Sequence, residues 1–135
     1  MVRKRILTLC LAVVMVVSLA SVCFAASVDF TSSSKMKFVD SNTWTYVCAA
    51  TKDSAGKTAS LSVTQIYDSN RVASLYQKVL AKATSSGTSV TASKGAVTSV
   101  AIPDAYQAAG KSVSLYCKGN NPSLDCYITG IWAVG

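Results

Sequence analysis

The chain contains no histidine and no glutamate among its 135 residues. The lack of histidine excludes Ser-His-Asp and Cys-His catalysis and the usual zinc sites. The lack of glutamate excludes Glu-based glycoside hydrolysis. The six acidic side chains are therefore all aspartates, and they are scattered along the chain. We expect a protein that is not an enzyme and that needs no metal or other cofactor.

Long apolar runs are also scarce, because only one is present and it lies at the N-terminus. A basic start at 3–5 precedes an apolar run over 6–22, and Cys23-Phe24-Ala25 follows with small residues at the two positions that a signal peptidase reads. This pattern predicts a secretory signal peptide over 1–25, cleaved between Ala25 and Ala26. An uncleaved membrane anchor is the alternative, although the run is just under the usual spanning length. The expected product is a secreted, extracellular chain with no membrane span.

The remaining residues, 26–135, are enough for one domain with a modest core. They contain ten Lys and Arg against six Asp, which leaves a net charge of +4. Basicity of this size favours polyanionic partners such as cell-wall polymers, but it is equally an ordinary charge for solubility. No run of even three basic residues occurs after the leader, so a nucleic-acid surface is not indicated.

Alternation of apolar and polar residues is the main structural signal in the mature chain. In 58–67 the residues Ala59, Leu61 and Val63 alternate with serines and a threonine, which is the period of a half-buried strand. Similar short runs recur with turn residues every ten or so positions. The pattern predicts an all-β fold, a single antiparallel sandwich or small barrel of about seven or eight short strands. Trp44 and Trp132 are the expected aromatic anchors of its core.

The segment 71–84 fits two structures. Its apolar residues follow the i, i+3, i+4, i+7 spacing of an amphipathic helix. They also alternate as a strand that ends at the turn 85–87. We favour the strand narrowly, because the flanking segments are both β-like.

The segment 113–132 has the form of a β-hairpin with a long turn. Placing Cys117 opposite Cys126 puts both sulfurs on the apolar face and predicts a disulfide that fixes the register. Cys48 is the third cysteine after the leader, so one thiol is left over. Pairing of Cys48 with either of the others, or three free buried thiols, are the alternatives.

The loop between these two strands is the best candidate for a binding surface. Asn120, Asn121 and Asp125 concentrate amide and carboxylate oxygens there, which suits carbohydrate or Ca²⁺. The same residues are ordinary turn formers, and a single carboxylate is weak support for a cation site.

The same C-terminal stretch carries a resemblance. Gly119-Asn120-Asn121-Pro122, Leu124-Asp125 and Gly130-Ile131-Trp132 resemble the ending of small, uncharacterised secreted β-proteins of Gram-positive bacteria. The resemblance covers about twenty residues, implies a small exported β-domain and brings no catalytic residues.

Two functions follow as hypotheses. The first is a secreted, non-enzymatic binding or interaction module at the bacterial cell surface, whose partner is a wall polymer, a glycan or a protein. The alternative is a secreted cationic antimicrobial protein of the bacteriocin kind, which small size, export and basic charge suggest.

Overall fold

The computed structural model describes residues 26–32, 35–36, 42–73, 77–120 and 125–135. The predicted leader, 1–25, lies outside these residues, and Ala26 begins the first strand. The described residues are all-β, as the alternation predicted. The strands are β1 (Ala26–Thr31), β2 (Thr45–Thr51), β3 (Thr58–Tyr67), β4 (Lys78–Ala83), β5 (Val90–Ser93), β6 (Val97–Ala101), β7 (Ser112–Gly119) and β8 (Tyr127–Val134). A single 3₁₀ turn, η1 (Asp104–Tyr106), precedes β7.

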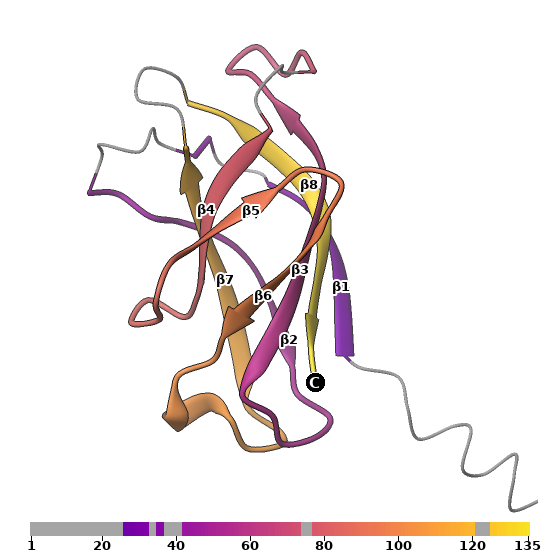
Figure 1. Ribbon diagram of the computed structural model, residues 1–135, viewed down its shortest axis with the longest axis vertical. Coiled ribbons are helices and arrows are strands. Elements are labelled where there is room, and N and C mark those ends of the chain that lie inside the picture. The colour runs from indigo at the N-terminus through magenta and orange to yellow at the C-terminus, as the bar shows by residue number, and fades with distance from the viewer. Residues whose placement is uncertain (1–25, 33–34, 37–41, 74–76, 121–124) are drawn as a thin grey trace, which may run out of the picture.

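The strands form two antiparallel sheets that pack face to face (Figure 1). The first sheet has the order β1-β8-β3-β6 and the second has the order β2-β7-β4-β5. Edge strands β1 and β2 lie alongside each other, as do β5 and β6. Of the strands in the described residues, only β4 and β5 are both consecutive in the chain and paired in one sheet. Each of the remaining connections between consecutive strands therefore carries the chain from one sheet to the other.

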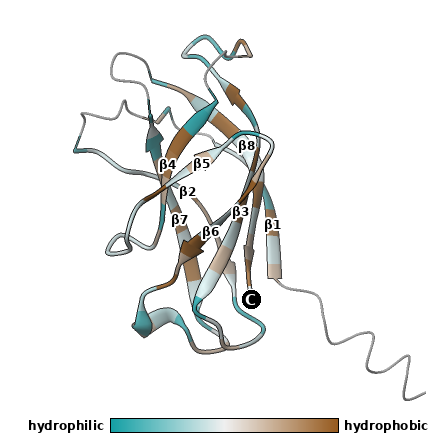
Figure 2. Ribbon diagram, in the orientation of Figure 1, coloured by the Kyte–Doolittle hydropathy of each residue, from teal (hydrophilic) through white to brown (hydrophobic). Residues whose placement is uncertain are grey.

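The core lies between the sheets and consists of the inward rows of each strand. Strands β7 and β8 alternate without interruption between buried and less buried residues, and the hydrophobic colour of Figure 2 lies mostly on the strands. Trp132 is 0% exposed, as predicted for a core anchor. Its indole Nε1 donates a hydrogen bond of 3.0 Å to the Val113 carbonyl. Because Trp132 belongs to β8 and Val113 to β7, this bond links the two sheets and satisfies the buried indole N–H.

The predicted hairpin between β7 and β8 is wrong. Strand β7 pairs with β2 and β4, whereas β8 pairs with β1 and β3. The connection between the two strands is long enough to cross the ~10 Å between packed sheets, so each strand finds two partners instead of one. The inward face was predicted correctly, because Leu115, Cys117 and Ile128 are all buried.

The predicted disulfide fails together with that pairing. Cys48, Cys117 and Cys126 are all free in the structure. Cys117 lies in β7 of the second sheet, and Cys126 lies just before β8 of the first sheet. No shared hairpin register therefore places their sulfurs opposite each other. The alternative of three free thiols describes the structure.

The ambiguous segment forms a strand over its second half, β4, while Arg71 and Val72 belong to the turn after β3. Val79, Ala81 and Ala83 of β4 are fully buried, while Lys78, Leu80 and Lys82 are not. Strand β4 pairs with β5 on one side and β7 on the other. These neighbours satisfy its backbone N–H and C=O groups, which a helix would satisfy internally. Residues 74–76 lie outside the described part.

Trp44 is not the second core anchor. In a regular strand Trp44, Tyr46 and Cys48 would share one face, but a β-bulge shifts the register between Tyr46 and Cys48. Tyr46 is consequently 53% exposed, while Cys48 packs against the core. An inserted residue reverses which side chains face inward. Trp44 is half-buried, and two lysine ammonium groups approach its ring.

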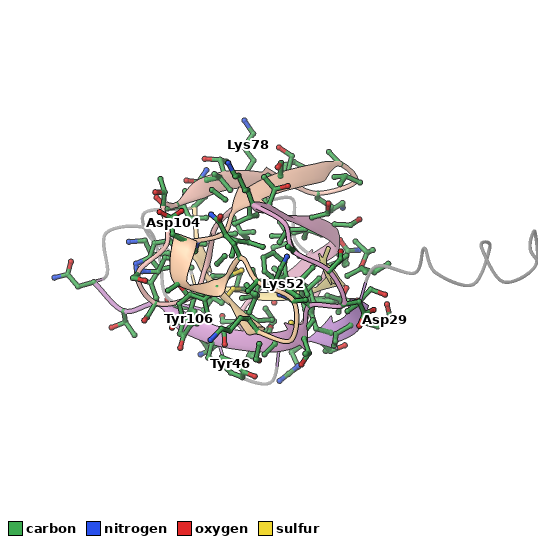
Figure 3. All side chains as sticks on the ribbon, turned by 90° about the horizontal axis from the view of Figure 1, so that it is seen from below. Asp29, Tyr46, Lys52, Lys78, Asp104 and Tyr106 are labelled. Carbon is green, nitrogen blue, oxygen red and sulfur yellow. The ribbon has the colours of Figure 1, made fainter. Side chains whose placement is uncertain are left out.

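One end of the core is occupied by a lysine. Lys52 follows β2 and is 1% exposed, and Figure 3 shows it near the middle of the molecule while Lys78 projects from the rim. Backbone hydrogen bonds hold it there: its N–H donates to Lys111 at 2.9 Å, and its carbonyl accepts from Gly110 at 2.8 Å. The Lys52 Nζ has no hydrogen-bond partner among the described residues.

Candidate binding pocket on the first sheet

An open pocket of ≈ 290 Å³ lies on the outer face of the first sheet. Two aromatic rings, one guanidinium and two hydroxyls line it: Thr31, Tyr67, Arg71, Tyr127 and Thr129. The lining residues come from β1, β3, β8 and the turn after β3. None of them is acidic.

The floor of the pocket is made of two rows of paired residues. Tyr67 of β3 lies directly opposite Tyr127 of β8, and Thr31 of β1 lies opposite Thr129 of β8. All four point outward because their neighbours in the strands, such as Ile66 and Ile128, point into the core. The hydroxyl of Thr129 is also 3.0 Å from that of Thr64. Alternation in β8, together with a β-bulge between Val63 and Gln65 of β3, therefore places both rings and both hydroxyls on one surface.

The guanidinium comes from a short turn that Asp68 organises. The Asp68 carboxylate accepts hydrogen bonds from the backbone N–H groups of Asn70, at 2.9 Å, and Val72, at 3.0 Å. The Asp68 carbonyl accepts from the N–H of Arg71 at 3.0 Å. Arg71 adopts a φ of 61°, the left-handed region that non-glycine residues rarely occupy. Such outliers cost free energy and gather at functional sites, so this one marks the turn as a candidate site.

Arg71 lies over the ring of Tyr127, with its Cζ 4.0 Å from the ring centroid. This cation–π contact holds in the pocket a guanidinium, a group that carries five N–H donors. No acidic residue lines the pocket with Arg71, and the Asp68 carboxylate accepts two backbone hydrogen bonds within the turn. The lining therefore combines a positive group, two rings and two hydroxyls. These groups suit a ligand that has an anionic group, C–H faces and hydroxyls.

The described residues of the loop that the sequence favoured do not line this pocket. Asn120 is exposed and Asp125 is half-buried, while Asn121 lies outside the described residues. Asp125 stands two residues before Tyr127, the first residue of β8. None of the five lining residues was predicted. One signal was available, since Arg71 is the only arginine after the leader and follows directly on a turn sequence.

The three cysteines are poor candidates for nucleophilic chemistry. Burial raises the pKa of Cys48 to about 11. Burial, together with the charge of Asp125, raises the pKa of Cys126 to about 11. The pKa of Cys117 is raised well above 9.0, first by burial and then by the neighbouring Cys48 and Cys126. The thiolate is the reactive form, so at neutral pH these are buried, protonated thiols.

Neither the described residues nor the comparisons with known proteins give a further assignment. In that part of the chain, no group of three or more His, Cys, Asp or Glu could hold a metal ion. No helix there has the length and apolar character to cross a membrane. The chain matches no protein-family model, no curated protein and no solved structure. The geometry is therefore the basis for assigning a function.

Proposed function

We propose that the chain is a secreted, non-enzymatic binding module whose ligand is an acidic carbohydrate at a cell surface. The observation that carries the proposal is Arg71, held over Tyr127 in an open pocket that two threonine hydroxyls complete. The guanidinium would bind the carboxylate or phosphate of one sugar residue through charge-assisted hydrogen bonds. Tyr67 and Tyr127 would pack against the C–H face of the sugar ring, and the threonines would hydrogen-bond its hydroxyls.

The surrounding structure supports binding rather than turnover. The floor of the pocket is rigid because its residues belong to paired strands, and ligand groups bind best to a surface that is already ordered. The lining residues supply no pair of carboxylates and no base within the pocket, so no acid–base pair is set up there.

Titration calorimetry with glucuronate and glucose tests the proposal. We expect glucuronate to bind and glucose to bind at least about tenfold more weakly, because a hydrogen bond to a charged group contributes roughly 1.5–3 kcal/mol. Arg71→Gln should remove that preference. Lys57→Gln, which makes the same change of charge at an exposed position outside the pocket, should retain it. Equal affinity for both sugars would contradict the proposal.

Export is the second part of the proposal. The basic start, apolar run and small residues of 1–25 support cleavage between Ala25 and Ala26. The intact mass of protein recovered from the culture medium tests this directly. A product that retains the leader would contradict it. Growth inhibition of neighbouring strains without any carbohydrate binding would favour the antimicrobial alternative.

A further inference from the structure

A second surface of different composition lies on the outer face of the second sheet. It consists of three aromatic rings and two lysines, which we call the tryptophan face: Trp44, Tyr46, Lys82, Tyr116 and Lys118. We infer that this face binds a linear acidic polysaccharide. The inference is independent of the pocket, because the two surfaces belong to different sheets.

Strand register builds the face. Tyr116 of β7 lies opposite Tyr46 of β2 on one side and opposite Lys82 of β4 on the other. The two tyrosine rings meet edge to face, with centroids 5.9 Å apart and planes at 73°. A row of side chains thus runs across three neighbouring strands, which offers an extended ligand several contacts in a line.

Both lysines are held against the same ring. The Nζ of Lys82 is 4.4 Å from the centroid of the Trp44 ring, and the Nζ of Lys118 is 5.0 Å from it. Lys82 also donates a hydrogen bond of 2.7 Å to the Ser85 carbonyl in the turn after β4. These contacts place two positive charges on the surface before any ligand binds, which lowers the ordering cost of binding.

The charge of this sheet identifies the kind of partner. Strands β2, β4, β5 and β7 contain lysines and no acidic residue, so the charged side chains of these strands are all positive. An anionic polymer complements that charge. The exposed ring of Tyr46 offers a flat apolar surface to a sugar ring.

Other anionic partners fit the geometry less well. Insertion of the face into a lipid layer would bury the two ammonium groups that stand on the Trp44 ring. Single-stranded nucleic acid requires several rings free for stacking, and here one ring is covered by lysines while two meet edge to face. An acidic polysaccharide needs one exposed ring and the positive charges, and both are present.

The two tryptophans give a selective readout. Trp132 is fully buried with its indole N–H bonded, so a change in tryptophan fluorescence on adding a polymer reports on Trp44. The probe is polygalacturonate, with neutral dextran, single-stranded oligo-dT and phosphatidylglycerol vesicles in parallel. We expect a saturable change with polygalacturonate and none with dextran. Trp44→Phe should abolish the signal.

Two lysine variants distinguish binding at the tryptophan face from a general effect of net charge. Lys82→Gln should weaken binding about fivefold, because it removes an ammonium group at the ring. Lys57→Gln makes the same charge change at an exposed position in the loop after β2, outside the strands of this sheet, and should change affinity less than about twofold. Arg71→Gln should leave the Trp44 signal intact. Equal weakening by both lysine variants, tighter binding of oligo-dT or vesicles, or a signal lost with Arg71→Gln would overturn the inference.

Discussion

Arg71 is the residue at which a strained backbone conformation coincides with a proposed ligand-binding side chain. A non-glycine residue in this region costs roughly 1–2 kcal/mol relative to an ordinary conformation, and the side chain is placed over Tyr127 in return. A glycine at the same position would relax the backbone but remove the guanidinium. Stability and binding should therefore respond differently to substitution here.

We predict that Arg71→Gly is about 1 kcal/mol more stable than Arg71→Ala, because only glycine relaxes the backbone. Both variants should lose the preference for glucuronate. Urea denaturation of the two variants measures the difference in the free energy of unfolding. Equal stability would mean that the turn does not hold this residue in the left-handed region.

Lys52 is the second residue whose environment calls for an explanation. A buried ammonium group without a partner loses its hydration and gains no compensating bond. Lys52→Met keeps the length of the side chain and removes the charge. We expect it to raise the free energy of unfolding by about 1–3 kcal/mol.

Lys57→Met is the control for that prediction, because Lys57 is exposed and follows in the same loop. It should change stability by less than about 0.5 kcal/mol. Thermal unfolding at fixed pH and salt compares the two variants. Destabilisation by Lys52→Met would show that the ammonium group has a stabilising partner.

At the scale of elements, β8 is the strand on which the first sheet depends. It lies between β1 and β3, and Gly130 in its middle allows the neighbouring strand and an aromatic ring to approach. A Cβ added at Gly130 would collide with the Ser62 carbonyl and lie 2.9 Å from the Phe30 ring. Neither the backbone nor the buried ring can move away cheaply.

Gly130→Ala should accordingly lower the free energy of unfolding by about 1–3 kcal/mol, the usual cost of overpacking. Ile131→Ala, at the next position but facing outward, should cost less than this because no collision is created. Chemical denaturation measures both. A loss for Gly130→Ala no larger than for Ile131→Ala would contradict the packing argument.

Elements also show why part of the fold was predictable from local pattern. The inward rows of β7 and of residues 59–63 in β3 follow the alternation of their own residues, so they could be assigned without knowing any partner strand. The bulge between Tyr46 and Cys48 could not be assigned in this way. A bulge depends on how two strands fit each other, and nothing within β2 marks it.

For the whole molecule, the buried thiols should make the folded state less stable at alkaline pH. Folding raises the pKa of Cys48 and Cys126 from 9.0 to about 11. Between these two values the folded state retains protons that the unfolded state has released, so the free energy of unfolding falls as the pH rises. The contribution of the protonated thiols is fully present below pH 9 and is lost as the pH rises from 9 through 11.

We therefore predict that the free energy of unfolding, measured in reductant, declines between pH 9 and 11. Tyrosine and lysine also titrate in this range, so the comparison is with the double variant Cys48→Ala/Cys126→Ala. Its decline over the same interval should be shallower. Identical slopes would mean that these thiols do not carry the effect.

Local sequence determined that this protein is β-rich, which residues of most strands face inward, and that Trp132 and Cys117 belong to the core. Those features depend on the two-residue period of a strand, which is visible in the chain itself. Tertiary structure alone decided that β7 and β8 belong to opposite sheets, that Trp44 faces outward, and that Arg71 meets Tyr127 across 56 positions of sequence. Partner choice depends on contacts between distant segments, and a local pattern contains no information about those contacts.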